Sequence, residues 1–126
     1  MLKTVRRTAG MTGAAVGISI LGSGLAFADG TAFVAGGGGR AHYDSSSNVF
    51  TVRDTNCDGT SVAGLWRWRG TDGPWRAIVD TTCESGEGVR RTLDPPANAT
   101  GIAIQACHVT ASGVLFDCGA IVRTNK

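Results

Sequence analysis

The stretch RDTNCDGT, residues 53–60, comes closest to a known pattern for metal chemistry. Asp54, Asn56 and Asp58, with a glycine directly after them, have the spacing that opens a calcium-binding EF-hand loop. Such a loop ends with a bidentate Glu at its twelfth position, where this chain has Leu65. We therefore interpret the stretch as a turn whose Asp and Asn side chains accept backbone hydrogen bonds, and we predict no metal site. Weak calcium binding by a partial loop is the alternative.

Four cysteines favour disulfides: Cys57, Cys83, Cys107 and Cys118. They include no C-x-x-C pair of the kind that binds zinc or acts in redox chemistry. Cys107 and Cys118 are equidistant from the 112–113 centre, so a hairpin with loop residues 111–114 places them opposite each other. At a non-hydrogen-bonded position their Cα atoms would lie about 4.5 Å apart, which suits a disulfide. We predict this bridge, and a second one between Cys57 and Cys83 at the open end of the tryptophan-rich hairpin.

The same hairpin would place His108 opposite Asp117, a pairing that could supply a base and the group that orients it. No serine stands in a turn that would make it a nucleophile beside this pair. We interpret the two residues as a cross-strand polar contact and predict no catalytic residue and no cofactor. A small hydrolase that uses them is one alternative function.

The stretch WRWR, residues 66–69, is the most unusual local pattern. On a strand, Trp66 and Trp68 project from one face and the two arginines from the other. The tryptophans fit a core, with the arginines solvated or stacked on aromatic rings. The functional interpretation is an exposed aromatic and arginine patch, with Trp66, Arg67 and Trp68 as partner-binding residues.

The residues Trp66-Arg67-Trp68 are similar to the Trp-Arg-Tyr motif of the small secreted actinobacterial α-amylase inhibitors, which are also two-disulfide β-sandwiches. In that family the motif sits on a turn and its arginine enters the cleft of the enzyme. Here the motif falls in an expected strand, and the cysteine spacing differs. The resemblance covers three residues and implies a second alternative function, a secreted inhibitor of a hydrolase.

Short segments of alternating apolar and polar residues run from Arg40 to the end of the chain, separated by turn residues every 8–12 positions or so. No helical period stands out among them. Strands are expected within residues 42–44, 48–54, 61–70, 74–82, 88–93, 101–109 and 114–122. We therefore predict a single all-β domain over residues 40–126, an immunoglobulin-like antiparallel β-sandwich of about seven strands with two disulfides.

The N-terminal residues 1–28 have the pattern of a secretory signal peptide: a basic start, a small apolar run and an A-x-A site before Asp29. The chain has 12 basic and 10 acidic residues, and cleavage would remove three of the basic ones. The mature chain is then slightly acidic, which does not favour a nucleic-acid binder. No second apolar run approaches membrane-spanning length. We expect a secreted, extracellular protein without a membrane or nucleic-acid partner.

Residues 29–39 contain the apolar segment TAFVA followed by four glycines. Glycine loses much backbone entropy on ordering, so we expect a flexible neck that holds residues 31–35 outside the domain. A short apolar strand on a neck can be donated to the sheet edge or groove of a partner. Thr31, Phe33 and Val34 are the candidate partner-binding residues of this segment.

The whole layout resembles the small exported β-sandwich proteins of actinobacteria, among them the adaptor (stalk) subunit of umbrella toxin particles. In that assembly, an immunoglobulin-like adaptor with an N-terminal extension joins a large toxin-bearing subunit to lectin-bearing subunits. The resemblance implies a secreted, non-enzymatic adaptor of an antibacterial toxin complex whose residues 31–35 enter a partner subunit. The expected partners are therefore other secreted proteins.

Overall fold

The computed structural model describes residues 28–56, 59–82 and 88–125. Within these ranges the chain forms strands and no helix. The strands are β2 (Gly30–Phe33), β3 (Gly39–Asp44), β4 (Val49–Asp54), β5 (Ser61–Arg69), β6 (Arg76–Asp80), β7 (Val89–Thr92), β8 (Gly101–Val109), β9 (Leu115–Phe116) and β10 (Val122–Asn125). The prediction of an all-β chain is thus confirmed.

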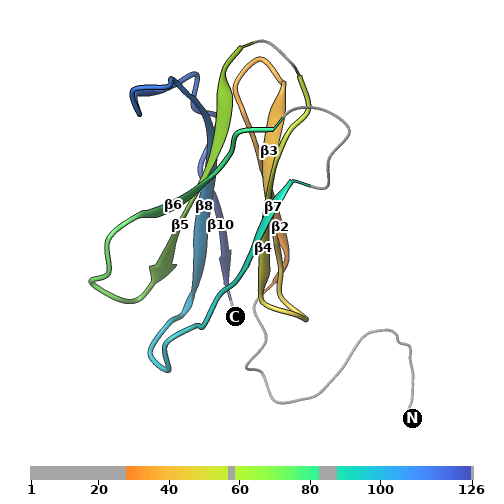
Figure 1. The fold of residues 1–126 in the computed structure, drawn as a ribbon. Coiled ribbons are helices and arrows are strands. Elements are labelled where there is room, and N and C mark those ends of the chain that lie inside the picture. The colour runs from red at the N-terminus through yellow and green to blue at the C-terminus, as the bar shows by residue number, and fades with distance from the viewer. Residues whose placement is uncertain (1–27, 57–58, 83–87, 126) are drawn as a thin grey trace.

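Two antiparallel sheets face each other (Figure 1). One sheet has the order β10-β8-β5-β6, with β9 also paired to β8, and the other has the order β2-β3-β4-β7. The β6 and β7 edges lie side by side at one margin of this sandwich. Within the described ranges, no helix is long and apolar enough to cross a membrane.

The core lies between the two sheets because every second residue of the facing strands is apolar. Its largest fully buried side chains include Tyr43, Phe50, Ile102 and Ile104. Gly64 on β5 lets the sheets approach: a Cβ atom there would lie 2.2 Å from Cγ2 of Val52, far inside van der Waals contact. The small residue at this position therefore sets how closely β4 and β5 pack.

The N-terminal segment is a strand of the fold, and the prediction of a flexible tether outside the domain is wrong. β2 pairs antiparallel with β3, and Ala32 and Val34 point into the core with exposed fractions of 0% and 2%. Gly36–Gly38 have φ of 81°, 88° and 96°, a region that favours glycine, and they make the turn between the two strands. The run of glycines thus serves a tight turn, and the domain starts before residue 40.

The disulfide between Cys107 and Cys118 is present, as predicted, with a Cα–Cα distance of 4.0 Å. The second predicted pair, Cys57 and Cys83, lies outside the described residues. This bridge, the one that the described residues contain, links β8 to the segment that directly follows β9.

The register of that hairpin differs by one residue from the prediction. The N–H of Thr110 donates to the carbonyl of Val114, and Leu115 pairs with Val109, where we expected Thr110 to face Leu115. Asp117 then adopts a left-handed backbone with φ of 49°. This bulge absorbs one residue and brings the next residue, Cys118, opposite its partner.

Candidate binding site

The proposed partner-binding residues of β5 lie where this strand extends beyond its neighbour β6. β6 begins at Arg76, opposite Trp66, whereas β5 runs on to Arg69 and pairs with β8 to its end. Residues 70–75 cross from one strand to the other as a loop. The hydroxyl of Thr71 donates to the carbonyl of Trp68 at 3.0 Å and accepts the N–H of Gly73, which fixes the start of that loop. Two hollows border this end of β5.

The first hollow, which we call the Trp pocket, has a volume of about 490 Å³. It lies between the β5–β6 loop and the segment that follows β7. Both tryptophans of the WRWR stretch line it, together with polar side chains and three prolines; the main contributors are Trp66, Trp68, Arg76, Asp94, Pro95 and Asn98. Aromatic, charged and amide groups thus share one cavity, which is the usual make-up of a ligand or partner site.

The second hollow, which we call the arginine groove, has a volume of about 250 Å³. It lies on the outer face of the five-stranded sheet, and its main side chains are Arg67, Arg69, Trp75, Ala103 and Arg123. Arg67 and Trp68 line both hollows. The two hollows therefore form one surface around the end of β5.

Trp66 belongs to the core, so its assignment as a partner-binding residue needs correction. Its exposed fraction is 3%, and its ring packs against Phe50 with centroids 5.3 Å apart. The guanidinium of Arg91 lies over the ring of Trp66, 5.7 Å from the centroid, which is a cation–π contact. Little more than its edge is left to line the Trp pocket.

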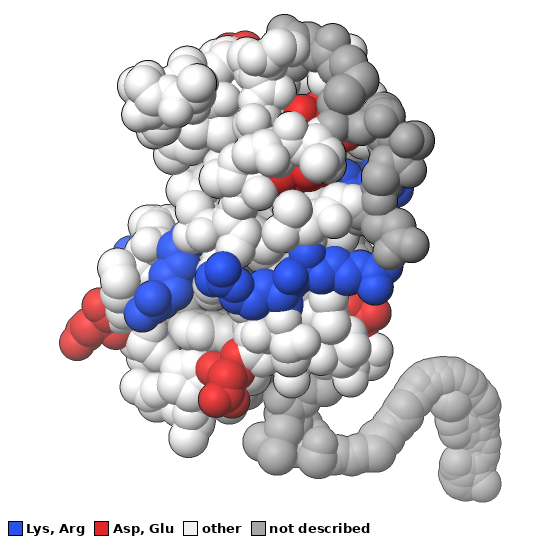
Figure 2. Space-filling model, in the orientation of Figure 1, with Lys and Arg blue, Asp and Glu red and all other residues white. Residues whose placement is uncertain are grey.

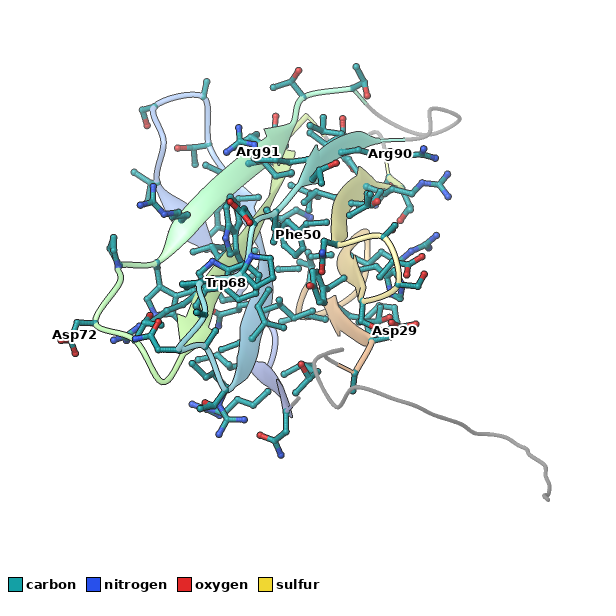
Figure 3. All side chains as sticks on the ribbon, turned by 90° about the horizontal axis from the view of Figure 1, so that it is seen from below. Asp29, Phe50, Trp68, Asp72, Arg90 and Arg91 are labelled. Atoms are coloured by element: carbon teal, nitrogen blue, oxygen red, sulfur yellow. A yellow bond between two sulfur atoms is a disulfide. The ribbon has the colours of Figure 1, made fainter. Side chains whose placement is uncertain are left out.

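Trp68 is only half-buried, and its ring meets Tyr43 edge-on with centroids 6.2 Å apart. Figure 3 shows Trp68 near the middle of the molecule, seen from below, with Asp72 at the far end of the β5–β6 loop. Its neighbour Arg67 is exposed. These two residues of the WRW motif are the ones that a partner can reach.

Arginines dominate the charge of this region. The side chains of Arg67 and Arg76 are exposed and form no hydrogen bond or ion pair with the residues that the structure describes. Arg69 instead donates to the carbonyl of Thr124 and the side chain of Asn125. Figure 2 shows basic side chains as a band across the face on which β6 and β7 lie in front. The surface around Trp68 therefore favours groups of negative charge.

The three candidate residues of the N-terminal segment have separate environments on the other sheet. The hydroxyl of Thr31 is hydrogen-bonded to Nδ1 of His42 at 2.7 Å, and Val34 is buried. Phe33 has an exposed fraction of 61%, the highest among the exposed large apolar side chains. Of the three, only Phe33 offers a large apolar surface to a partner.

His108 and Asp117 do lie close together, with 3.9 Å between Nδ1 and the nearest carboxylate oxygen. That distance suits an ion pair when the imidazole is protonated, and it is too long for a hydrogen bond. His108 is also buried and packs on the ring of Phe116, with centroids 5.4 Å apart. The side chains of His108 and Asp117 thus form a polar contact at the bulge.

Asp54, the first residue of the calcium-like stretch, acts as a turn residue. Its carboxylate accepts the N–H of Asn56 at 3.1 Å, and its own N–H donates to the carboxylate of Asp80 at 2.9 Å. Asp58 lies outside the described residues. Among the described residues, no three side chains of His, Cys, Asp or Glu are grouped as metal ligands.

Several residues of the surface were missed by sequence reasoning. Trp75, Arg76, Asp94, Asn98 and Arg123 come from four different segments, and only folding brings them to Trp68. The signal available for Trp75 was its alternation with the residues that follow it on the outer face of β6. Nothing local marks the others as members of one site.

No known protein family and no curated protein matches the chain. A solved structure with a similar fold is an endonuclease/exonuclease/phosphatase from Beutenbergia cavernae DSM 12333, with a TM-score of 0.55 and 20% sequence identity over 76% of this chain. The chain spans 26% of the length of that protein. This likeness concerns the fold alone, because one fold hosts many functions.

Proposed function

We propose that this protein is a secreted, non-enzymatic binding module, an adaptor that holds a protein partner in an extracellular complex. The observation that carries the proposal is the surface around Trp68, where two exposed arginines without a described partner, Arg67 and Arg76, flank an aromatic ring beside two hollows. Tryptophan and arginine dominate the binding energy of protein interfaces.

The construction of the surface supports this role. The Trp pocket has one wall made by a hydrogen-bonded loop and another that contains two prolines, which restrict the backbone. A preformed hollow loses little conformational entropy on binding, so more of the contact energy appears as affinity. A partner side chain inserted beside Trp68 would be shielded from water by the rim.

Export through a signal peptide over residues 1–28, an immunoglobulin-like topology and the second bridge between Cys57 and Cys83 belong to the same proposal. The Cys107–Cys118 disulfide supports export, because such bonds persist in oxidising compartments. Since residues 30–33 form a strand of the domain's own sheet, the partner contact moves from the N-terminal segment to the WRW surface. Exposed Phe33 is then an accessory contact at most.

The test is capture of partners from the culture medium of the producing cells by the tagged mature chain. Trp68→Ala and Arg67→Ala should each weaken capture of the same protein by about tenfold or more, because such residues cost about 2 kcal/mol when truncated. Arg40→Ala, on the outer face of the other sheet, is the matched control. Equal capture by all four proteins would refute the proposal.

A hydrolase inhibitor is the second candidate, favoured by the exposure of Arg67 at the centre of the WRW motif. An exposed arginine on the outer face of a strand can enter the cleft of an enzyme and pair with its carboxylates. Inhibition of an α-amylase by the wild type, lost in Arg67→Ala with an unchanged melting temperature, would favour this function. If the wild type leaves the enzyme fully active at a high molar excess, α-amylase is excluded as its target.

A further inference from the structure

We propose that the arginine groove binds a tetrahedral oxyanion, the phosphate or sulfate group of an ester whose organic part lies against Trp75. This site lies on the outer face of the five-stranded sheet and borders the Trp pocket, with which it shares Arg67 and Trp68. It shares Arg67 with the proposed partner surface, but it stands on the groove alone and is tested without a protein partner.

The strand register places two arginines on either side of a small residue. Arg67 of β5 pairs with Ala103 of β8, and Ala103 pairs with Arg123 of β10. Neighbouring strands are about 4.8 Å apart, so the two arginine Cα atoms are separated by about 10 Å. The side chain of Ala103 is a single methyl group with an exposed fraction of 6%, so it is covered, and both long side chains can converge above it.

A third arginine belongs to the same groove. Arg69 follows two positions after Arg67 on β5, on the same face of the sheet, and pairs with Gly101, which has no side chain. Its guanidinium is held by the carbonyl of Thr124 at 3.2 Å and by Asn125. This arginine is therefore oriented in advance, and it adds positive charge at the end of the gap.

Among the residues that the structure describes, no acidic side chain lines the groove. Arg67 and Arg123 are both exposed, and neither side chain has a hydrogen bond or ion pair with a described residue. Three like charges on β5 and β10, on either side of β8, repel one another unless an anion lies between them. A bound dianion would neutralise this repulsion.

The arrangement favours a tetrahedral anion over a carboxylate. Each guanidinium offers two parallel N–H groups, which match two oxygens of one anion. A carboxylate has two oxygens, and one arginine fork occupies both, whereas a phosphate or sulfate ester has three terminal oxygens and can meet forks from opposite sides. The charge of a phosphate ester near neutral pH also comes closer to that of two arginines.

Trp75 indicates what carries the anionic group. Its exposed fraction is 37%, and it lines the groove together with Arg67. A flat indole beside an oxyanion site can pack against the apolar face of a sugar or another ring. The ligand is therefore expected to be an ester with a ring, such as a sugar phosphate.

The experiment measures binding of inorganic phosphate and of glucose 6-phosphate to the full mature protein, by thermal shift and calorimetry at constant ionic strength set with chloride. Inorganic phosphate and glucose 6-phosphate should each raise the melting temperature of the wild type. Arg67→Gln and Arg123→Gln should each weaken binding by about tenfold or more, because each removes charge-assisted hydrogen bonds to the anion. Arg40→Gln should bind like the wild type.

Two further arms separate the parts of the proposal. Trp75→Ala should weaken the binding of glucose 6-phosphate and leave the binding of inorganic phosphate unchanged. Glucuronate should bind the wild type more weakly than glucose 6-phosphate or inorganic phosphate does. Equal shifts in every variant would show a general salt effect and overturn the site. Glucuronate binding at least as tightly as phosphate would overturn the tetrahedral assignment. A variant that loses anion binding and still captures the partner, or one that binds the anion and no longer captures the partner, would show that the anion site and the partner surface are separate.

Discussion

Tyr43 is the only tyrosine of the chain, and its ring is buried between the sheets. Its hydroxyl donates a hydrogen bond to the side chain of Asn48, in the turn that follows β3. Burial, with the nearby charges of Asp29 and Asp44, raises the pKa of Tyr43 to about 12. The neutral phenol is therefore part of the folded state at any ordinary pH.

A pH titration should show this shift. Because the folded pKa lies above the unfolded value of 10.0, the contribution of Tyr43 to stability is complete below about pH 10 and is lost as pH rises toward 12. Ultraviolet absorbance of the phenolate should give a midpoint near 12 in the folded protein and near 10 in denaturant. Tyr43→Phe should remove the decline of stability over this range. A folded midpoint near 10 would contradict the burial of the ring.

Gly64 gives a second test at the residue scale. The Cβ of an alanine there would lie 2.2 Å from Val52 and 3.1 Å from the ring of Phe50, so the facing sheets would have to separate. Overpacking of this kind costs about 1–3 kcal/mol, and we expect Gly64→Ala to lower the free energy of unfolding by that amount in urea titrations. Gly73→Ala, with its nearest neighbour at 3.4 Å, is the control and should change stability little.

Among the elements, β2 departs furthest from what the sequence suggests. Glycine permits both a flexible neck and a tight turn, so four glycines alone do not distinguish the two. What decides is long-range: the pairing of β2 with β3 and the burial of Ala32 and Val34 offset the cost of ordering the segment. Neither contact can be read from residues 29–39.

Two adjacent residues of this segment test its role. Val34 is buried with an exposed fraction of 2%, whereas Phe33 points outward. Val34→Asp should lower the free energy of unfolding by roughly 3 kcal/mol or more, because it buries a charge without a partner. Phe33→Asp should stay within about 1 kcal/mol of the wild type. Circular dichroism melts would contradict the account if both variants behaved like the wild type, as a free tether would.

The β8–β9 hairpin shows a different limit of sequence reasoning. Symmetry around the 112–113 centre is enough to identify the Cys107–Cys118 bridge, because a disulfide tolerates only close partners. The bulge at Asp117 has no such signature, since a non-glycine residue with positive φ is held by its surroundings rather than by its own preference. The pairing was therefore predictable and the register of the tip was not.

The bridge should contribute measurably to stability. Replacing both cysteines by alanine should lower the free energy of unfolding by about 3 kcal/mol, since the bridge restricts a short loop of the unfolded chain. Denaturant titrations of the wild type and the double variant give this value directly. A difference below about 0.5 kcal/mol would mean that the hairpin is held by its other contacts alone.

For the molecule as a whole, the fold class followed from alternating short segments and turn residues, because this pattern depends on local spacing. The surface around Trp68 could be predicted only in part. The WRW motif marks Arg67 and Trp68, but the two hollows are made by loops and strands that are distant in the chain. The guanidinium of Arg91 lies over the buried ring of Trp66, and this arginine comes from the opposite sheet.

We propose that the surface around Trp68 holds a protein partner. Quantitative mass spectrometry of proteins captured from the medium of the producing cells, with wild type, Trp68→Ala and Arg40→Ala side by side, tests it most directly. We predict one partner that wild type and Arg40→Ala retain equally and that Trp68→Ala loses by about tenfold or more while staying folded. Retention of that partner by folded Trp68→Ala at the wild-type level would contradict the claim.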